Sequence, residues 1–242
     1  MRRSPFAALC RKELRSLFFS PVFYGTGAFF IFFLSFWLYY LQVFFALDSA
    51  SLRPFFSGFP LAYIFAVPAI TMKSWAEEKK LGTVEFLYTW PFSEWDLCIG
   101  KFLSSFIALL VYVLLTLPVP LSLLPLARFD LGVICAEYAG AVLLGAVVIS
   151  IGQFFSCASK NQAAAFLGCS ALLLVLMIPG LTGFGASLSS VPAKFINYVS
   201  LSFHFESFAR GLLDSRDLAF FILSTALFLF LNTRVLIFGR RK

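Results

Sequence analysis

The sequence has few residues that could carry out catalysis or hold a metal ion. It contains one histidine, His204, and its five cysteines form no Cys-x-x-Cys pair. A zinc site of the usual composition needs several closely spaced Cys and His ligands, so this chemistry is excluded. A single histidine also lacks the orienting partner that a general base requires. We therefore predict free cysteines, no catalytic residue, no metal site and no cofactor bound by this chain, with His204 on the polar face of a loop helix.

Charged residues are scarce as well. They make up 13% of the 242 residues, whereas 60% are hydrophobic and 33 are phenylalanine. A soluble domain typically has about 25% charged and about 45–50% apolar residues. The composition therefore excludes an ordinary soluble domain and predicts a polytopic membrane protein. The net charge of +7 comes from basic residues whose distribution matches that of a membrane protein, so it does not indicate binding to nucleic acid.

Long apolar runs separated by short polar segments predict an all-α fold with six transmembrane helices. A helix needs about 20 mainly apolar residues to cross the hydrocarbon core. We interpret residues 1–242 as a single transmembrane domain. The six spans are expected at about residues 22–47, 55–72, 98–117, 131–155, 163–179 and 218–238.

Lysine and arginine are distributed unequally between the two sides of this arrangement. With both chain ends on the inner side, fourteen of the nineteen lie in inner segments. Cytoplasmic loops carry such an excess, so we predict a multi-pass protein of the cell (inner/cytoplasmic) membrane with both termini in the cytoplasm. Residues 5–20 have apolar side chains at helical spacing among basic ones, which predicts an amphipathic helix at the cytoplasmic interface.

The sequence also lacks an energy source of its own. No nucleotide-binding loop of the GxxxxGK(S/T) type occurs. Ion-coupled transporters place acids or histidine within the hydrocarbon region, but here the nearest candidates are Glu137 and Arg234. Both lie near span ends, where we expect their long side chains to reach an interface. The energy for any transport is therefore expected to come from another subunit.

The densest charged stretch, residues 73–85, lies between the second and third predicted spans. Ser74 and Glu77 have the spacing of a capping box. Gly82 then supplies the permissive backbone that commonly ends a helix. These signals predict a cytoplasmic helix of about two turns, which is too short to be stable alone in water.

This short helix has an apolar side formed by Trp75 and Leu81, and it mixes acids with bases. A stretch that only set topology would need bases alone. Thr83 looks like the start of a second short helix, Val84–Trp90. We therefore predict a rigid element that docks into a cleft on a soluble partner.

The longest predicted loop, residues 180–216, precedes the last span. Its second half is predicted to be an amphipathic helix, because Phe205 and Phe208 share one face. Glu206 and Arg210 are four residues apart on the other face, where opposite charges stabilise a helix.

Residues 68–101 resemble the signature of the type-two ABC exporter permeases, and the closest subgroup is the gliding-motility-like permeases. The matching pattern consists of Glu77-Glu78, Gly82-Thr83, Glu85, a Pro-x-Ser at residues 91–93, and Gly100-Lys101 at the start of the next span. The chain departs from this pattern at Trp90, where small or aliphatic residues are usual.

The resemblance implies roles for the matching positions. The ATPase-coupling helix would contain Ser74, Trp75, Glu77, Glu78, Lys79, Gly82, Thr83 and Glu85. The outer loop would be re-entrant, and its helix would contain Phe205, Glu206, Phe208 and Arg210. The N-terminal amphipathic helix would be the interfacial connecting helix.

The function implied is that of the permease subunit of an ATP-driven exporter. Its partners would be two copies of a separate ABC ATPase, which would bind the ATP and Mg²⁺, and a second permease chain in a homo- or heterodimer within the bilayer. Two alternatives stay open: a membrane anchor or scaffold of an envelope or motility machine, and an ion-coupled transporter or channel. The sequence does not indicate the substrate.

Overall fold

The computed structural model describes residues 5–42, 51–83, 93–125, 129–182, 198–211 and 214–240. Within these ranges the chain is helical and has no strand, which confirms the all-α prediction. The elements are α1 (Pro5–Phe18), α2 (Pro21–Phe36), the π-helix η1 (Trp37–Leu41), α3 (Arg53–Phe56), α4 (Phe59–Thr71), α5 (Lys73–Leu81), α7 (Glu94–Leu115), α8 (Pro118–Leu123), α9 (Leu131–Ala158), α10 (Gln162–Thr182), α12 (Leu201–Ala209) and α13 (Ser215–Arg240).

Six helical stretches of the described chain are long and apolar enough to cross a membrane, and this confirms the predicted number. They are Pro21–Leu41, Arg53–Leu81, Glu94–Leu123, Leu131–Ala158, Gln162–Gly180 and Ser215–Gly239. The second is longer than its predicted range because α4 continues into α5. The last residues of the predicted first span, 43–47, lie outside the described ranges.

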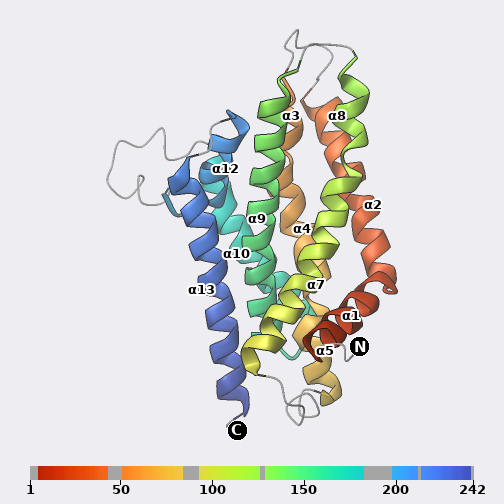
Figure 1. Cartoon of the computed structure of the whole chain (residues 1–242), viewed down its shortest axis with the longest axis vertical. Coiled ribbons are helices and arrows are strands. Elements are labelled where there is room, and N and C mark those ends of the chain that lie inside the picture. Colours follow the sequence, from red (N-terminus) through yellow and green to blue (C-terminus); the bar gives the residue numbers. More distant parts are fainter. Residues whose placement is uncertain are drawn as a thin grey trace.

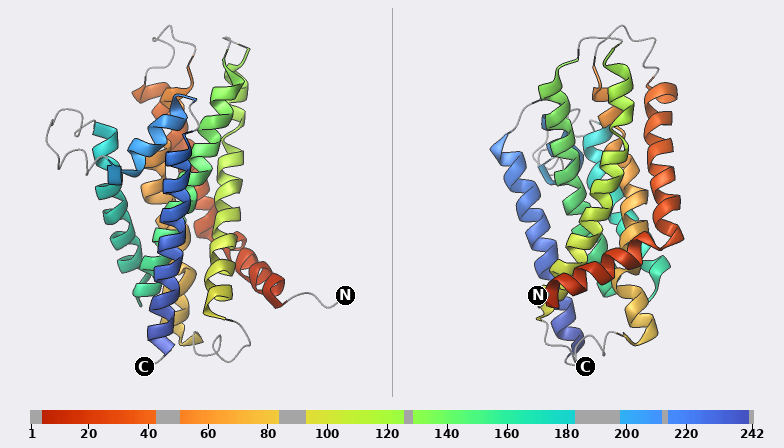
Figure 2. Two further views of the ribbon diagram at one scale, coloured as in Figure 1. Left: turned by 60° about the vertical axis from the view of Figure 1, so that its left-hand side comes forward. Right: turned by 45° about the vertical axis from the view of Figure 1, so that its right-hand side comes forward.

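The six stretches form a bundle with α1 and the last turn of α13 at the same end (Figure 1). We call this the terminal end. Six crossings would put both ends of the described chain on one side of the membrane, while the predicted cytoplasmic location of the termini stays a prediction. Helix α1 lies obliquely across the bundle at this end (Figure 2) and packs against α7 and α2. Its Leu9 is buried while Arg11 and Arg15 are exposed, so the predicted amphipathic helix is confirmed.

Helix α9 is central to the bundle and packs against α4, α5, α7, α10, α12 and α13. Glycines allow this close approach. A Cβ at Gly145 would lie 2.1 Å from Leu109 Cδ2, and one at Gly152 would lie 2.2 Å from Thr71 Oγ1. Small residues at such positions let membrane helices pack closely, and Ala141 and Gly145 have the four-residue spacing that puts two of them on one face of α9.

Aromatic side chains hold α2 and α4 against this centre. Phe30 stacks on Tyr63 with ring centroids 5.6 Å apart and an interplanar angle of 8°. The Tyr63 hydroxyl donates a hydrogen bond of 3.0 Å to the Ala141 carbonyl oxygen of α9. Because a buried hydroxyl needs such a partner, this contact fixes the depth of α4 relative to α9.

Candidate functional site

Helix α5 extends from α4 at the terminal end of the bundle (Figure 1). The connecting residue, Met72, keeps helical dihedrals of φ −55° and ψ −33°, and Ser74 lies inside the helix without making a side-chain cap. The predicted capping box at Ser74 is therefore wrong. The predicted helix end is confirmed, because Gly82 adopts a left-handed φ of 69° that glycine accepts without steric cost.

The cap of α5 comes from a different helix. The Ser156 hydroxyl of α9 accepts hydrogen bonds from the backbone N–H groups of Trp75 and Ala76, at 3.0 and 3.2 Å. The same hydroxyl donates to the Met72 carbonyl oxygen at 2.9 Å. These donors would otherwise lack partners at the start of α5, so α9 fixes where α5 begins.

A buried lysine connects α5 with α1 and α7. The Lys101 ammonium of α7 lies 3.1 Å from Glu13 Oε2 of α1 and 3.0 Å from Glu78 Oε1 of α5. It also donates to the Ser74 carbonyl oxygen at 2.7 Å. The Lys101 side chain is 1% exposed, so three acceptors satisfy the three N–H donors of a charge withdrawn from water.

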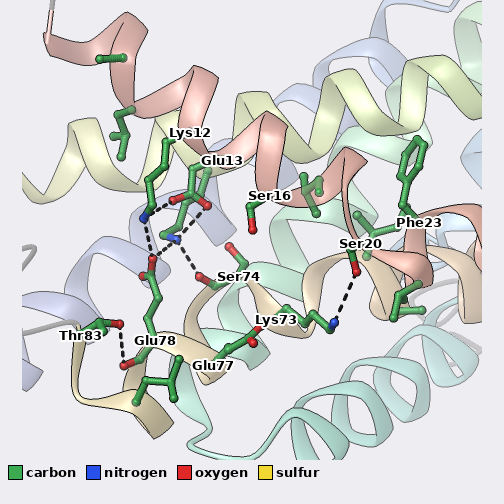
Figure 3. A pocket seen from close by; sticks show the side chains of 18 residues that line it. Lys12, Glu13, Ser16, Ser20, Phe23, Lys73, Ser74, Glu77, Glu78 and Thr83 are labelled. Carbon is green, nitrogen blue, oxygen red and sulfur yellow. Dashed lines mark hydrogen bonds and ion pairs between the residues drawn. The ribbon is translucent and has the colours of Figure 1, made fainter.

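A second lysine and an aromatic ring complete this group. Lys12 of α1 lies 3.2 Å from Glu13 and 3.3 Å from Glu78, and Figure 3 shows these three side chains meeting between α1 and α5. The buried Trp75 ring lies 4.8 Å from the Lys101 ammonium, within the range of a cation–π contact. We call Lys12, Glu13, Glu78 and Lys101 the Lys101 cluster. It joins three helices that the sequence separates widely.

The charges of the Lys101 cluster shift the pKa values of Glu13 and Lys12. Burial disfavours the charged form of Glu13, but Lys101 and Lys12 outweigh this effect and lower the pKa of its carboxyl below 4.5. Burial likewise acts against the charge of Lys12, yet Glu13 and Glu78 raise the pKa of its ammonium above 10.5. Both groups are therefore charged at neutral pH.

This shift predicts how stability depends on pH. When folding lowers the pKa of a carboxyl, its ionised form stabilises the folded state. For Glu13 this stabilisation is complete at pH values above 4.5, the pKa of the unfolded chain, and it is lost as the pH falls through the lower pKa of the folded state. We expect the difference in thermal unfolding midpoint between the native chain and Glu13→Gln to be constant from pH 7 to about pH 4.5. Below that pH the difference should shrink. A difference that grows on acidification would contradict this assignment.

The far end of α5 is held to α9 but presents a free tip. Lys79 donates to the Cys157 carbonyl oxygen and lies 3.9 Å from the Cys157 thiol. Beyond it, Leu81 is 68% exposed, and Gly82 and Thr83 are exposed as well. A large apolar side chain at a rigid helix end is suited to burial against another protein.

The predicted coupling residues therefore divide into two groups. Glu78, Trp75 and Lys79 point into the bundle and position α5, whereas the tip at Leu81 to Thr83 is open. Glu85 and the predicted second short helix lie outside the described residues. Sequence reasoning missed Glu13 as a member of the site, and its only signal for Lys101 was the Gly100-Lys101 pair of the resembling family.

The other predicted site lies towards the end opposite α5. Helix α12 buries Phe205 and Phe208 and carries the predicted Glu206–Arg210 ion pair at 2.9 Å. Glu206 also pairs with Arg53 at 2.7 Å, which links α12 to α3. Both parts of the prediction for this helix are confirmed, while its re-entrant position in a bilayer stays a prediction.

The prediction for His204 is wrong. The residue is 2% exposed, and its Nδ1 lies 2.6 Å from Asp217 Oδ1 of α13. Its Nε2 lies 2.8 Å from the Tyr198 carbonyl oxygen. This polar residue can lie on the face of α12 that packs on α13 because the buried Asp217 carboxylate pairs with it. A hydrophobicity pattern treats residues one at a time and does not reveal such pairs.

Glu137 also departs from its prediction. It was expected to reach an interface, but it is 1% exposed, and neither carboxylate oxygen has a hydrogen-bond partner among the described residues. The amides of Gln153 and Asn232 are buried in the same unpaired state within that part of the chain. Burying polar groups without hydrogen-bond partners costs free energy. These three side chains therefore require a bound water or another conformation that supplies a partner.

The chain matches a known protein family over most of its length. Residues 7–201 match the family model described as "ABC-2 family transporter protein". No curated protein matches the chain. The matched range begins in α1 and ends at the first residue of α12, so it contains every member of the Lys101 cluster and the whole of α5.

Proposed function

This chain belongs to the ABC-2 family of transporter proteins, and from that membership we propose that it couples ATP hydrolysis on a separate subunit to export across the membrane. Members of this family are the membrane subunits of ABC transporters, and their partners are an ABC ATPase and the bilayer. The proposed step is that α5 receives the motion of the ATPase and passes it to the spans.

The observation that carries the proposal is the way α5 is built. Its length is suited to docking, and its tip exposes Leu81. Its inner face is held to α7 by Lys101 and to α9 by Ser156 and by the contact of Lys79 with Cys157. A force on the tip would therefore act on α1, α7 and α9 together. This is what a rigid two-state element requires if a partner is to bias the whole bundle.

The proposed assembly follows from this role. Two ATPase subunits would bind ATP and Mg²⁺ on the cytoplasmic side, which is the terminal end of the bundle, in the cell (inner/cytoplasmic) membrane. A second permease chain, identical or related, would complete a pathway at a two-fold interface. In this proposal the chain itself performs no catalysis.

The test is a substitution at the tip of α5. Leu81→Arg should leave membrane insertion and the unfolding midpoint unchanged, because Leu81 is 68% exposed, but it should abolish co-purification with an ABC ATPase and the associated ATP hydrolysis. Leu81→Met, which keeps the apolar side chain, is the matched control. The measurement is affinity purification of the tagged chain from its native membranes, with mass spectrometry of bound proteins and an ATPase assay.

Two outcomes would overturn the proposal. One is the absence of any ABC ATPase from the purified native chain. The other is normal ATP hydrolysis with the Leu81→Arg variant. Persistent binding of non-transport envelope proteins without an ATPase would favour a scaffold instead.

A further inference from the structure

A cavity of about 650 Å³ lies between α1, the first turn of α2, the end of α4 and α5. One part of its lining is apolar and comes from the ends of two candidate spans, with Phe23 of α2 and Ile70 of α4. The other part is polar and includes Ser16, Lys73 and Glu77. The apolar part belongs to the ends of two candidate spans, and α1 borders the cavity. With these spans placed across a bilayer, the cavity would lie at the depth of lipid headgroups in the leaflet next to the terminal end.

Two opposite charges in this lining, Lys73 and Glu77, form no ion pair among the described residues. Within the Lys101 cluster both ammonium groups have carboxylate partners, although Glu78 Oε2 is buried without a hydrogen-bond partner among the described residues. Within the same part of the chain, Lys73 makes only a hydrogen bond of 3.4 Å to the Ser20 hydroxyl, near the limit for such a bond. Glu77 has no ion pair or hydrogen bond among the described residues. Residues four apart on a helix commonly pair, yet Lys73 extends towards Ser20 and away from Glu77 (Figure 3).

We propose that this cavity binds the headgroup of a zwitterionic aminophospholipid of the phosphatidylethanolamine type. The phosphate would take the free donors of Lys73, and the primary ammonium would donate to Glu77. The acyl chains would leave along Phe23 and Ile70. The inference depends on the placement of the spans in a bilayer. It does not require ATPase docking, although Leu81 and Thr83 at the tip of α5 also line the cavity.

The charges distinguish this lipid from its common neighbours. A choline headgroup has a cation but no N–H donor, so it cannot hydrogen-bond to Glu77. A glycerol headgroup has hydroxyl donors but no cation, so it leaves the negative charge of the carboxylate uncompensated beside a phosphate. A soluble phosphoethanolamine compound has the same charges but no acyl chains to fill the apolar part.

The test is competition among lipids for the full-length chain, purified and delipidated in mild detergent and followed by native mass spectrometry. The probes are dioleoyl phosphatidylethanolamine, phosphatidylcholine and phosphatidylglycerol, with glycerophosphoethanolamine as the chain-free headgroup. We expect phosphatidylethanolamine to exceed phosphatidylcholine by about tenfold, the ratio that one charge-assisted hydrogen bond supports. Glycerophosphoethanolamine should compete only at far higher concentration.

Variants locate the site. Glu77→Gln should remove the preference for phosphatidylethanolamine over phosphatidylcholine, and Lys73→Gln should weaken the binding of both. Lys80→Gln is the matched control, because Lys80 is exposed on the same helix outside this cavity. If a variant fails to fold, the lipid ranking of the native chain still decides.

Four results would overturn the inference. Equal binding of the ethanolamine and choline lipids would remove its basis. Tighter binding of phosphatidylglycerol would indicate an anion site. Equal competition by the chain-free headgroup would indicate a soluble ligand. A preference that both variants retain would place the lipid elsewhere.

Discussion

Replacing Lys101 with methionine is expected to lower the free energy of unfolding by about 3 kcal/mol and to uncouple α5 from the bundle. The substitution leaves Glu13 and Glu78 facing each other without the ammonium that lies 3.1 and 3.0 Å from them. Their side chains are only 12% and 15% exposed, so water compensates them poorly. Lys12 remains, which is why the expected cost lies at the lower end of the range for breaking a buried ion pair.

The measurement combines stability with coupling. Unfolding of the purified chain by SDS titration reports the free energy. Under the proposed function, ATP hydrolysis by the complex with its ATPase would report the coupling. Lys160→Met is the matched control, because it removes an exposed lysine beyond the end of α9 and should change neither quantity by more than a few tenths of a kcal/mol.

A triple variant separates charge from shape. Lys101→Met combined with Glu13→Gln and Glu78→Gln removes the stranded charges, so we expect most of the lost stability to return. ATP hydrolysis should stay low, since α1, α5 and α7 would no longer be joined by ion pairs. A single variant as stable as the native chain would show that Lys101 does not hold these helices together.

The sequence predicted those features of the fold that depend on neighbouring residues. Apolar runs located the six candidate spans. Ser93 and Asp96 have the three-residue spacing of a capping box. The box is present, since the Ser93 hydroxyl accepts from the Asp96 N–H at 3.1 Å and the Asp96 carboxylate accepts from the Ser93 N–H at 3.1 Å. The glycine that ends α5 was equally local. Each of these signals acts within one or two helical turns, so a linear reading finds it.

The site itself depended on contacts between distant segments. A capping box at Ser74 was predicted because its spacing is local, but Ser156 caps α5 from 81 residues away. Nothing in the spacing of Glu13 indicates that it faces Lys101, because the crossing of α1 over α7 brings them together. Buried polar partners are chosen by tertiary packing, and a single sequence without its fold does not identify them.

His204→Phe is expected to lower the free energy of unfolding by about 3 kcal/mol, and Asp217→Leu by about 1–2 kcal/mol. The order follows from what each change leaves behind. Without His204, the Asp217 carboxylate loses its imidazole partner at a site that is 6% exposed. Without Asp217, the imidazole keeps its other partner, because Nε2 can still donate to the Tyr198 carbonyl oxygen, 2.8 Å away. Loss of an acid in the first turn of α13 adds a smaller helix-dipole cost.

The double variant tests whether the pair acts as one unit. A phenyl ring at position 204 keeps the stacking on Phe220, where the ring centroids lie 3.8 Å apart, and Leu at 217 leaves no buried charge. We expect the double variant to be within about 1 kcal/mol of the native chain, so that the two single costs do not add. Unfolding by SDS titration of all four proteins completes the cycle. If Asp217→Leu cost more than His204→Phe, the carboxylate would be serving the α13 helix start, and the join between α12 and α13 would depend on apolar packing alone.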